Sequence, residues 1–145
     1  MRKQAKDTRT FLIDTNVFVS AVKRPRKGGA LNLLLKIIGE PTIHLVGNDL
    51  LVEEMLRYAQ LLRSETALAI VSTLLTKMEI VEVKENYRRA CKPYISTPDR
   101  ADILHAATCL QTDSILITND RHFDKINDAG VVEVWDITRA IKNLD

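Results

Sequence analysis

Two acidic residues that follow short apolar runs are the side chains of this sequence best placed to do chemistry. Asp14 directly follows residues 11–13, and Asp120 follows residues 115–118 after one intervening residue. Short β-prone runs of this kind predict buried strands, so each acid is expected just beyond the carboxyl end of a strand. In an open α/β sheet these ends share one edge, and that edge is where ligands bind. Asp14 and Asp120 are therefore candidate site residues.

Helical geometry selects one acid of the neighbouring pair Glu53 and Glu54. Apolar residues with helical period predict a helix over residues 48–62, with Asn48 as its N-cap. Glu53 can pair with Arg57 one turn further on, and it is expected to face solvent. Glu54 lies at the border of the apolar stripe instead. Glu54 is therefore the candidate functional acid of this helix.

A later helix carries two more candidate acids, Asp99 and Asp102. Thr97 is its expected N-cap and Pro98 its first residue, and the helix is expected to run to about Gln111. Asp102 borders the buried stripe of this helix. Asp99 precedes it by three residues, so both acids can point the same way. Asp99 also has a simpler explanation, because the helix dipole favours a negative charge in the first turn.

Several carboxylates that converge in a half-buried place repel one another, and without a counter-charge some of them stay protonated. A hard divalent cation, Mg²⁺ or Mn²⁺, relieves this repulsion, because it prefers oxygen ligands and keeps waters for chemistry. Such an ion activates a water and stabilises the charge that grows on a phosphate. The joint placement of the acids therefore predicts phosphodiester hydrolysis. Taken singly, Asp14 and Asp120 have an alternative role as helix caps, and Glu54 as an exposed helix residue.

The expected elements alternate between strands and helices along the chain. Strands are expected at residues 10–13, 42–46, 79–83, 114–118 and 131–134, and helices at 17–22, 30–38, 48–62, 64–77, 85–91, 97–111, 122–127 and 137–142. This alternation predicts an α/β fold with a parallel sheet covered by helices. Residues 10–145 are expected to form a single domain, and residues 1–9 a flexible basic N-terminus.

Net charge leaves nucleic-acid binding open. A net charge of +2 over 145 residues is too small to indicate a nucleic-acid-binding protein. A basic cluster surrounds Pro25, and it either holds RNA phosphates or forms a solvated loop. It consists of Lys23, Arg24, Arg26 and Lys27.

The cysteines and histidines are too scattered to predict a disulfide or a zinc site. Cys91 and Cys109 form no CxxC pair, and they are expected to be reduced thiols of a cytoplasmic protein. No run approaches the roughly 20 apolar residues that a membrane span needs. His44, His105 and His122 lack zinc-ligand spacing, so each is expected to have a structural or surface role.

Four segments, in order along residues 10–141, resemble the PIN-domain family. Residues 11–16 look like its opening strand and first acid, and residues 51–56 look like its acidic helix with Glu54 in register. Residues 102–110 are similar to the most recognisable helix of the family. Residues 117–120 look like its Thr-x-Asp motif, with Phe123 matching an aromatic residue often found just beyond.

The resemblance implies a three-layer α/β/α sandwich around a central, mostly parallel sheet, with Mg²⁺ or Mn²⁺ as cofactor. It also implies cleavage of single-stranded RNA by water, leaving a 5′-phosphate and a 3′-hydroxyl. The implied metal ligands are Asp14, Glu54, Asp102, Asp120 and, at a position that varies more among relatives, Asp99. Asn16 and Thr118 would orient carboxylates or waters.

A compact PIN domain resembles the VapC toxins, which implies a homodimer silenced by a VapB-type antitoxin whose tail enters the acidic groove. Other functions remain open at this point: a nuclease of RNA processing or ribosome maturation, a PIN scaffold that binds RNA or protein without cutting, and a nuclease that cuts DNA. A phosphoacceptor receiver domain fits poorly, because it needs adjacent acids after the first strand and a lysine after the last. Asp14 is followed by Thr15 and Asn16, and residues 131–136 contain no lysine.

Overall fold

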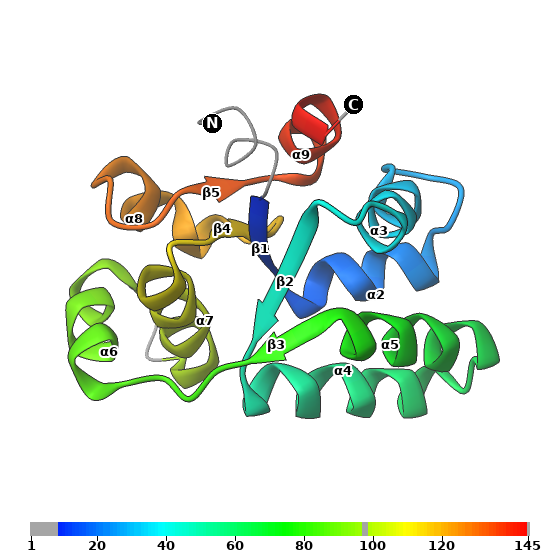
Figure 1. The fold of residues 1–145 in the computed structure, drawn as a ribbon, viewed down its shortest axis with the longest axis horizontal. Coiled ribbons are helices and arrows are strands. Elements are labelled where there is room, and N and C mark those ends of the chain that lie inside the picture. Colours follow the sequence, from blue (N-terminus) through cyan, green and yellow to red (C-terminus); the bar gives the residue numbers. More distant parts are fainter. Residues whose placement is uncertain (1–8, 97–98, 145) are drawn as a thin grey trace.

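The computed structural model describes residues 9–96 and 99–144, and its centre is a five-stranded sheet in the order β3-β2-β1-β4-β5 (Figure 1). All four pairings between neighbouring strands are parallel. The strands are β1 (Arg9–Ile13), β2 (Ile43–Gly47), β3 (Met78–Ile80), β4 (Ile115–Ile117) and β5 (Val134–Trp135). This arrangement confirms the predicted α/β fold with a parallel sheet.

Helices cover both faces of the sheet. They are α2 (Thr15–Lys23), α3 (Ala30–Gly39), α4 (Asp49–Leu62), α5 (Glu65–Lys77), α6 (Glu85–Cys91), α7 (Arg100–Thr112), α8 (Asp124–Asp128) and α9 (Ile137–Leu144), with short 3₁₀ turns η1 (Lys92–Tyr94) and η2 (Arg121–Phe123). Helix α7 packs against β1, β2 and β4, and α6 packs on the side of α7 that faces away from the sheet. Helices α3 and α9 lie on the other side of the sheet (Figure 1). None of the helices in the described part of the chain is long and apolar enough to span a membrane.

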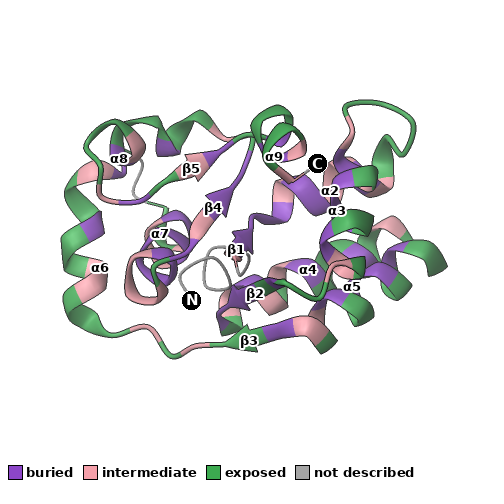
Figure 2. Ribbon diagram, turned by 45° about the horizontal axis from the view of Figure 1, so that its top comes forward, coloured by how far each residue is buried: buried purple, intermediate pink, exposed green. Residues whose placement is uncertain are grey.

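Strand β1 lies at the centre of the sheet because its residues are apolar on both faces. Phe11, Leu12 and Ile13 are almost fully buried. Figure 2 shows β1 and β4 as largely buried strands, whereas the outer surfaces of α4, α5 and α6 are exposed. A continuous apolar run is what a parallel strand covered on both faces requires.

Side-chain caps fix the start of the helices that carry the acids. The side-chain oxygen of Asn48 accepts a hydrogen bond of 2.9 Å from Leu51 N, which confirms it as the N-cap of α4. Helix α7 begins at Arg100 with Asp99 as its N-cap, and Asp99 accepts from Ala101 N at 2.8 Å. The predicted cap at Thr97 was therefore wrong, and Thr97 and Pro98 lie outside the described residues.

The edge strands differ most from expectation. Strand β3 covers Met78–Ile80 rather than 79–83, and β5 covers Val134–Trp135 rather than 131–134. Each is a short strand with a single neighbour in the sheet, so β-propensity alone does not extend it. Val131 N instead bonds to Ile126 O in the turn that ends α8, which keeps residue 131 out of the sheet. The N-terminal prediction also shifts, since Arg9 already belongs to β1, while residues 1–8 lie outside the described part.

Candidate metal centre

Two neighbouring strands bring Asp14 and Asp120 to the same edge of the sheet. Strands β1 and β4 pair in parallel with Ile13 opposite Ile117, and Asp14 N continues the ladder with a bond of 3.0 Å to Ile117 O. Asp14 comes directly after β1, and Asp120 follows β4 by three residues. The sequence prediction that both acids share one edge is thus met by the backbone pairing itself.

The hydroxyl of Thr118 ties this edge together. It donates to Asp14 Oδ2 at 2.8 Å, and it accepts from Asp120 N at 2.9 Å and from Asn16 Nδ2 at 3.2 Å. One donor and two acceptor positions are all that a hydroxyl has, so its hydrogen bonding is complete. Asp14 sits at the N-cap position of α2 but makes no capping hydrogen bond with its side chain.

Helices α4 and α7 contribute Glu54 and Asp102 to the same place. Glu54 Oε1 accepts from Thr15 Oγ1 at 3.0 Å and lies 3.0 Å from His105 Nε2, so the start of α2 and the middle of α7 both hold it. His105 is buried, and its Nδ1 lies 3.2 Å from the amide nitrogen of Asn48. Glu54 is thereby fixed by a network from three elements, while its neighbour Glu53 faces solvent as predicted.

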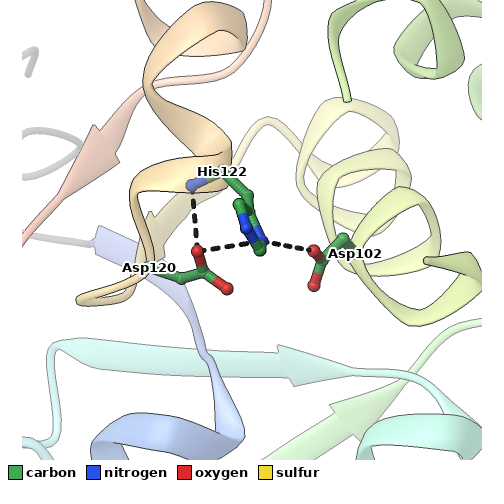
Figure 3. A group of neighbouring side chains, drawn as sticks. All are labelled: Asp102, Asp120 and His122. Carbon is green, nitrogen blue, oxygen red and sulfur yellow. Dashed lines mark hydrogen bonds and ion pairs between the residues drawn. The ribbon is translucent and has the colours of Figure 1, made fainter. Parts of the chain in front are cut away.

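His122 lies between the carboxylates of Asp102 and Asp120 (Figure 3). Its Nδ1 is 3.4 Å from Asp102 Oδ2 and 3.1 Å from Asp120 Oδ1. Its backbone N–H also donates to Asp120 Oδ1 at 2.9 Å, which caps η2. Asp120 therefore caps the following 3₁₀ turn, which was the alternative role considered for it, and it also faces Asp102.

Burial and mutual repulsion dominate the electrostatics of Asp102 and Asp14. Burial raises the pKa of Asp102 to about 6, and the negative charges of Asp99, Asp120 and Asp14 act in the same direction. Burial also raises the pKa of Asp14, against the lowering effects of His105 and the Thr118 hydrogen bond, and the Glu54 charge adds to the rise. Both acids therefore resist ionisation in the absence of a nearby positive charge.

Glu54 behaves in the opposite way. Burial acts to raise its pKa, but the hydrogen bond and charge of His105, together with the hydrogen bond from Thr15, outweigh burial and lower the pKa below its ordinary value. Glu54 is thus a carboxylate that the fold keeps ionised.

The donor set fits a hard divalent cation. Asp102 is only 7% exposed, and its Oδ2 has no hydrogen-bond partner among the described residues. A buried carboxylate oxygen left unpaired is costly, and a cation that binds it removes the cost. Asp102, Asp120 and His122 each offer one ligand atom, all within 4.8 Å of one another. Mg²⁺ or Mn²⁺ with carboxylate and water ligands suits such a site. Asp14 and Glu54 are not part of this group, although the charge of Asp14 acts on Asp102.

The remaining predicted site residues lie around this cluster. Asp99 is exposed and caps α7, so its simpler explanation holds in part; its charge still reaches Asp102, and metal binding by Asp99 stays a prediction. Asn16 contacts Thr118 rather than a carboxylate, and its Oδ1 is buried without a partner among the described residues.

The basic cluster is exposed and lines an open cleft of about 620 Å³. Ser20 and Asn119 line the same cleft, and Asn119 directly precedes Asp120. The acids of the centre do not line the cleft, so only the sequence neighbour Asn119 connects the two. Its four basic side chains are Lys23, Arg24, Arg26 and Lys27.

Sequence reasoning missed two histidines of the centre. Each histidine was expected to have a structural or surface role. His105 is buried, which agrees with a structural role, but its bond to Glu54 was not foreseen, although a histidine among the apolar positions of α7 was a usable signal. His122 agrees only in part, because its half-exposed ring faces two acids. His44 is exposed, which agrees with a surface role.

Fold and site together define a parallel-sheet α/β/α domain with a cluster of acids beyond the carboxyl ends of β1 and β4. A family model, the PIN domain, matches residues 11–129, and the chain belongs to this family. PIN domains are in general nucleases that use divalent metals. The family membership agrees with the resemblance seen in the sequence.

Solved structures share the fold at low sequence identity. VapBC from Salmonella typhimurium bound to DNA matches with a TM-score of 0.62 and 16% identity over 90% of this chain and 99% of that chain. VapBC2 from Rickettsia felis, bound to a DNA fragment from their promoter, gives 0.61 and 16% over 88% and 98%. FitAcB from Neisseria gonorrhoeae gives 0.61 and 20% over 88% and 98%. At these identities the likeness establishes the fold alone, and no curated protein matches the chain at a significant level.

Proposed function

We propose that the protein is a metal-dependent endoribonuclease that cleaves single-stranded RNA, acting as the toxin of a VapBC-type pair. The observation that carries this proposal is the state of Asp102, a buried acid beside other acids. Its Oδ2 has no hydrogen-bond partner among the residues that the structure describes, and its pKa is raised to about 6. A fold that leaves an acid in this condition is built for a missing positive charge. Membership of a nuclease family and an adjoining basic cleft support the same interpretation.

The protein's residues divide the work of such a reaction. Asp14, Asp102 and Asp120 would hold the metal, and Thr118 would keep the Asp14 carboxylate turned toward it. When bound there, Mg²⁺ or Mn²⁺ would supply an activated water and would neutralise charge on the phosphate. Both hydrogen bonds that the described residues make to Glu54 fall on Oε1, so its other oxygen is the one available to orient a water.

The basic cleft is the proposed path of the RNA strand. Its four cations are exposed, and Asn119, which precedes Asp120 in the sequence, lines the same cleft. Cations placed in this way bind phosphates and position a strand without reading its sequence. The cleft thereby would align a phosphodiester with the acids.

The proposed partners are a second copy of the chain and a VapB-type antitoxin. The fold-related structures named above include VapBC complexes, which supports the antitoxin and leaves its contacts on this chain as part of the proposal. Co-expression with a neighbouring antitoxin gene, followed by sedimentation analysis, tests both partners. A monomer at micromolar concentration that captures no antitoxin contradicts them.

An RNA-cleavage assay tests the catalytic proposal directly. Single-stranded RNA and DNA oligonucleotides are incubated with the protein and Mn²⁺ or Mg²⁺, and then with Asp14→Asn and Asp102→Asn. Asp113→Asn is the matched control, because Asp113 is exposed at the far end of α7 in a left-handed conformation that Asn also tolerates. RNA cleavage that needs metal and both acids supports the proposal. Cleavage of DNA alone, or a metal-bound protein that cuts neither, contradicts it and favours the DNA nuclease or the binding scaffold.

A further inference from the structure

We propose that His122 is itself a metal ligand through Nδ1, which gives the centre a mixed oxygen and nitrogen donor set that favours Mn²⁺ over Mg²⁺. The inference rests on the proposed function only in requiring that the acid cluster bind a divalent ion. No sequence pattern singles out this histidine as a ligand, but the structure places it between two candidate ligands (Figure 3).

The distances between donor atoms are those of neighbouring ligands on one ion. In an octahedral site with bonds of about 2.1 Å, adjacent ligand atoms lie roughly 3 Å apart. His122 Nδ1 lies 3.1 Å from Asp120 Oδ1 and 3.4 Å from Asp102 Oδ2. All three ligand atoms fit within 4.8 Å of one another, so an ion can contact them with small adjustments.

The ring of His122 joins both acids through one atom. Its Nδ1 lies at ion-pair distance from Asp102 Oδ2 and from Asp120 Oδ1, and Asp102 Oδ2 has no closer hydrogen-bond partner among the described residues. One nitrogen and two carboxylate oxygens at these separations are as close to one another as the ligands of a shared cation.

The backbone prepares this arrangement before any ion binds. Asp120 Oδ1 accepts from the backbone N–H of His122, and Asp120 N donates to Thr118. The two hydrogen bonds hold the turn from Thr118 to His122 in place beside Asp102. Ligands that are already positioned lose little conformational freedom on binding.

Nitrogen ligation changes the metal preference in a testable direction. Mg²⁺ takes oxygen ligands and keeps several waters, whereas imidazole binds the softer transition-metal ions more readily. His122→Ala should therefore weaken Mn²⁺ binding at least tenfold and change Mg²⁺ binding less than threefold. His44→Ala, which removes an exposed histidine on β2, is the matched control and should leave both affinities unchanged.

Titration calorimetry of the whole protein with MnCl₂ and MgCl₂ measures the affinities, and pulsed electron paramagnetic resonance of the Mn²⁺-loaded protein detects a directly bound nitrogen. The expected result is a ¹⁴N coupling in the wild type and in His44→Ala that disappears in His122→Ala. Circular dichroism checks that each variant is folded. If His122→Ala does not fold, His122→Asn takes its place.

Other outcomes overturn the inference and separate it from the proposed function. If His122→Ala binds Mn²⁺ as tightly or more tightly, His122 is a counter-charge that the metal displaces, and the inference fails. The same holds if both metals weaken equally or if the ¹⁴N coupling persists without His122. In each of these cases the nuclease proposal stands as long as Asp102→Asn abolishes binding. A wild-type protein that binds neither ion removes both.

Discussion

The Glu54 side and the Asp102 side of the centre bury a carboxylate in opposite ways. Glu54 receives hydrogen bonds from Thr15 and His105, and its pKa is lowered. Asp102 lies among other acids, its Oδ2 has no hydrogen-bond partner in the part of the chain that the structure describes, and its pKa is raised to about 6. The fold thus favours the ionised form of Glu54 and disfavours that of Asp102. Sites of the second kind cost stability in exchange for function.

The largest expected effect separates the two acids by activity. Asp102→Asn should lower RNA cleavage roughly a thousandfold, equivalent to about 4 kcal/mol of transition-state stabilisation, because it removes a charged metal ligand. Glu54→Gln should lower it less, by roughly tenfold to a hundredfold, because an oxygen acceptor remains. Single-turnover cleavage rates measure both. Equal losses of cleavage rate in the two variants would show that Asp102 and Glu54 contribute equally to the reaction.

In the metal-free protein, neutralising Asp102 and neutralising Glu54 should change the free energy of unfolding in opposite directions. The folded pKa of Asp102 exceeds its ordinary value of 3.8, so its burial is harmless below about pH 4 and costs stability as the pH rises through about 6. In EDTA at pH 7.5, Asp102→Asn should therefore raise the free energy of unfolding, by about 3 kcal/mol at most.

Glu54→Gln should instead lower the free energy of unfolding by roughly 1–2 kcal/mol at the same pH. The pKa of Glu54 is lowered, so its contribution is present above its ordinary value of 4.5 and is lost as the pH falls through the lower folded value. Urea denaturation of both variants at pH 4 and 7.5 measures their free energies of unfolding. If both variants shift the free energy of unfolding in the same direction at pH 7.5, the two acids do not differ in how the fold treats their charge.

A smaller effect is expected from the residue that holds Glu54. His105→Leu should weaken Mn²⁺ binding and cleavage about tenfold, because outer partners of a metal site act on this scale. Thr108→Val is the matched control, since Thr108 is equally buried in α7 and bonds to Asn48 but not to Glu54. Calorimetry should show a lower affinity only for His105→Leu, while thermal denaturation shows both variants destabilised. An unchanged affinity in His105→Leu would limit His105 to a structural role.

The smallest effect should come from the basic cleft. Lys23→Glu and Arg26→Glu each should weaken RNA binding several-fold, and each should reduce the slope of the salt dependence by about one released counterion. Both side chains are exposed, so the free energy of unfolding should stay within about 0.5 kcal/mol of the wild type. Fluorescence anisotropy over a salt series measures the slope. An unchanged slope would mark the cluster as a solvated loop.

The sequence predicted the parts of this molecule that local pattern controls. Apolar runs located β1 and β4, and the parallel-sheet rule then placed Asp14 and Asp120 on one edge. Helical spacing selected Glu54 over Glu53 correctly with respect to burial. The ends of β3 and β5 were wrong because an edge strand extends only where its single partner continues.

Local pattern could not show which acids the histidines of the centre contact. His122 meets Asp102 only because η2 turns it back toward α7, and His105 meets Glu54 only because α4 and α7 pack together.

Burial explains why the two cysteines are reduced and unreactive. It raises the pKa of Cys91 to about 11 and raises the pKa of Cys109 as well, so both stay as unreactive thiols at neutral pH.

Asn48, the cap of α4, also decides which tautomer His105 adopts. Because its side-chain oxygen accepts from Leu51 N, its amide nitrogen must face His105 and Thr108. That nitrogen can only donate, so in the neutral form of His105 Nδ1 is the acceptor and the ring proton lies on Nε2, which donates a hydrogen bond to Glu54. Replacing Asn48 with Ser, an equally good cap, would preserve the start of α4 but would no longer determine the tautomer of His105.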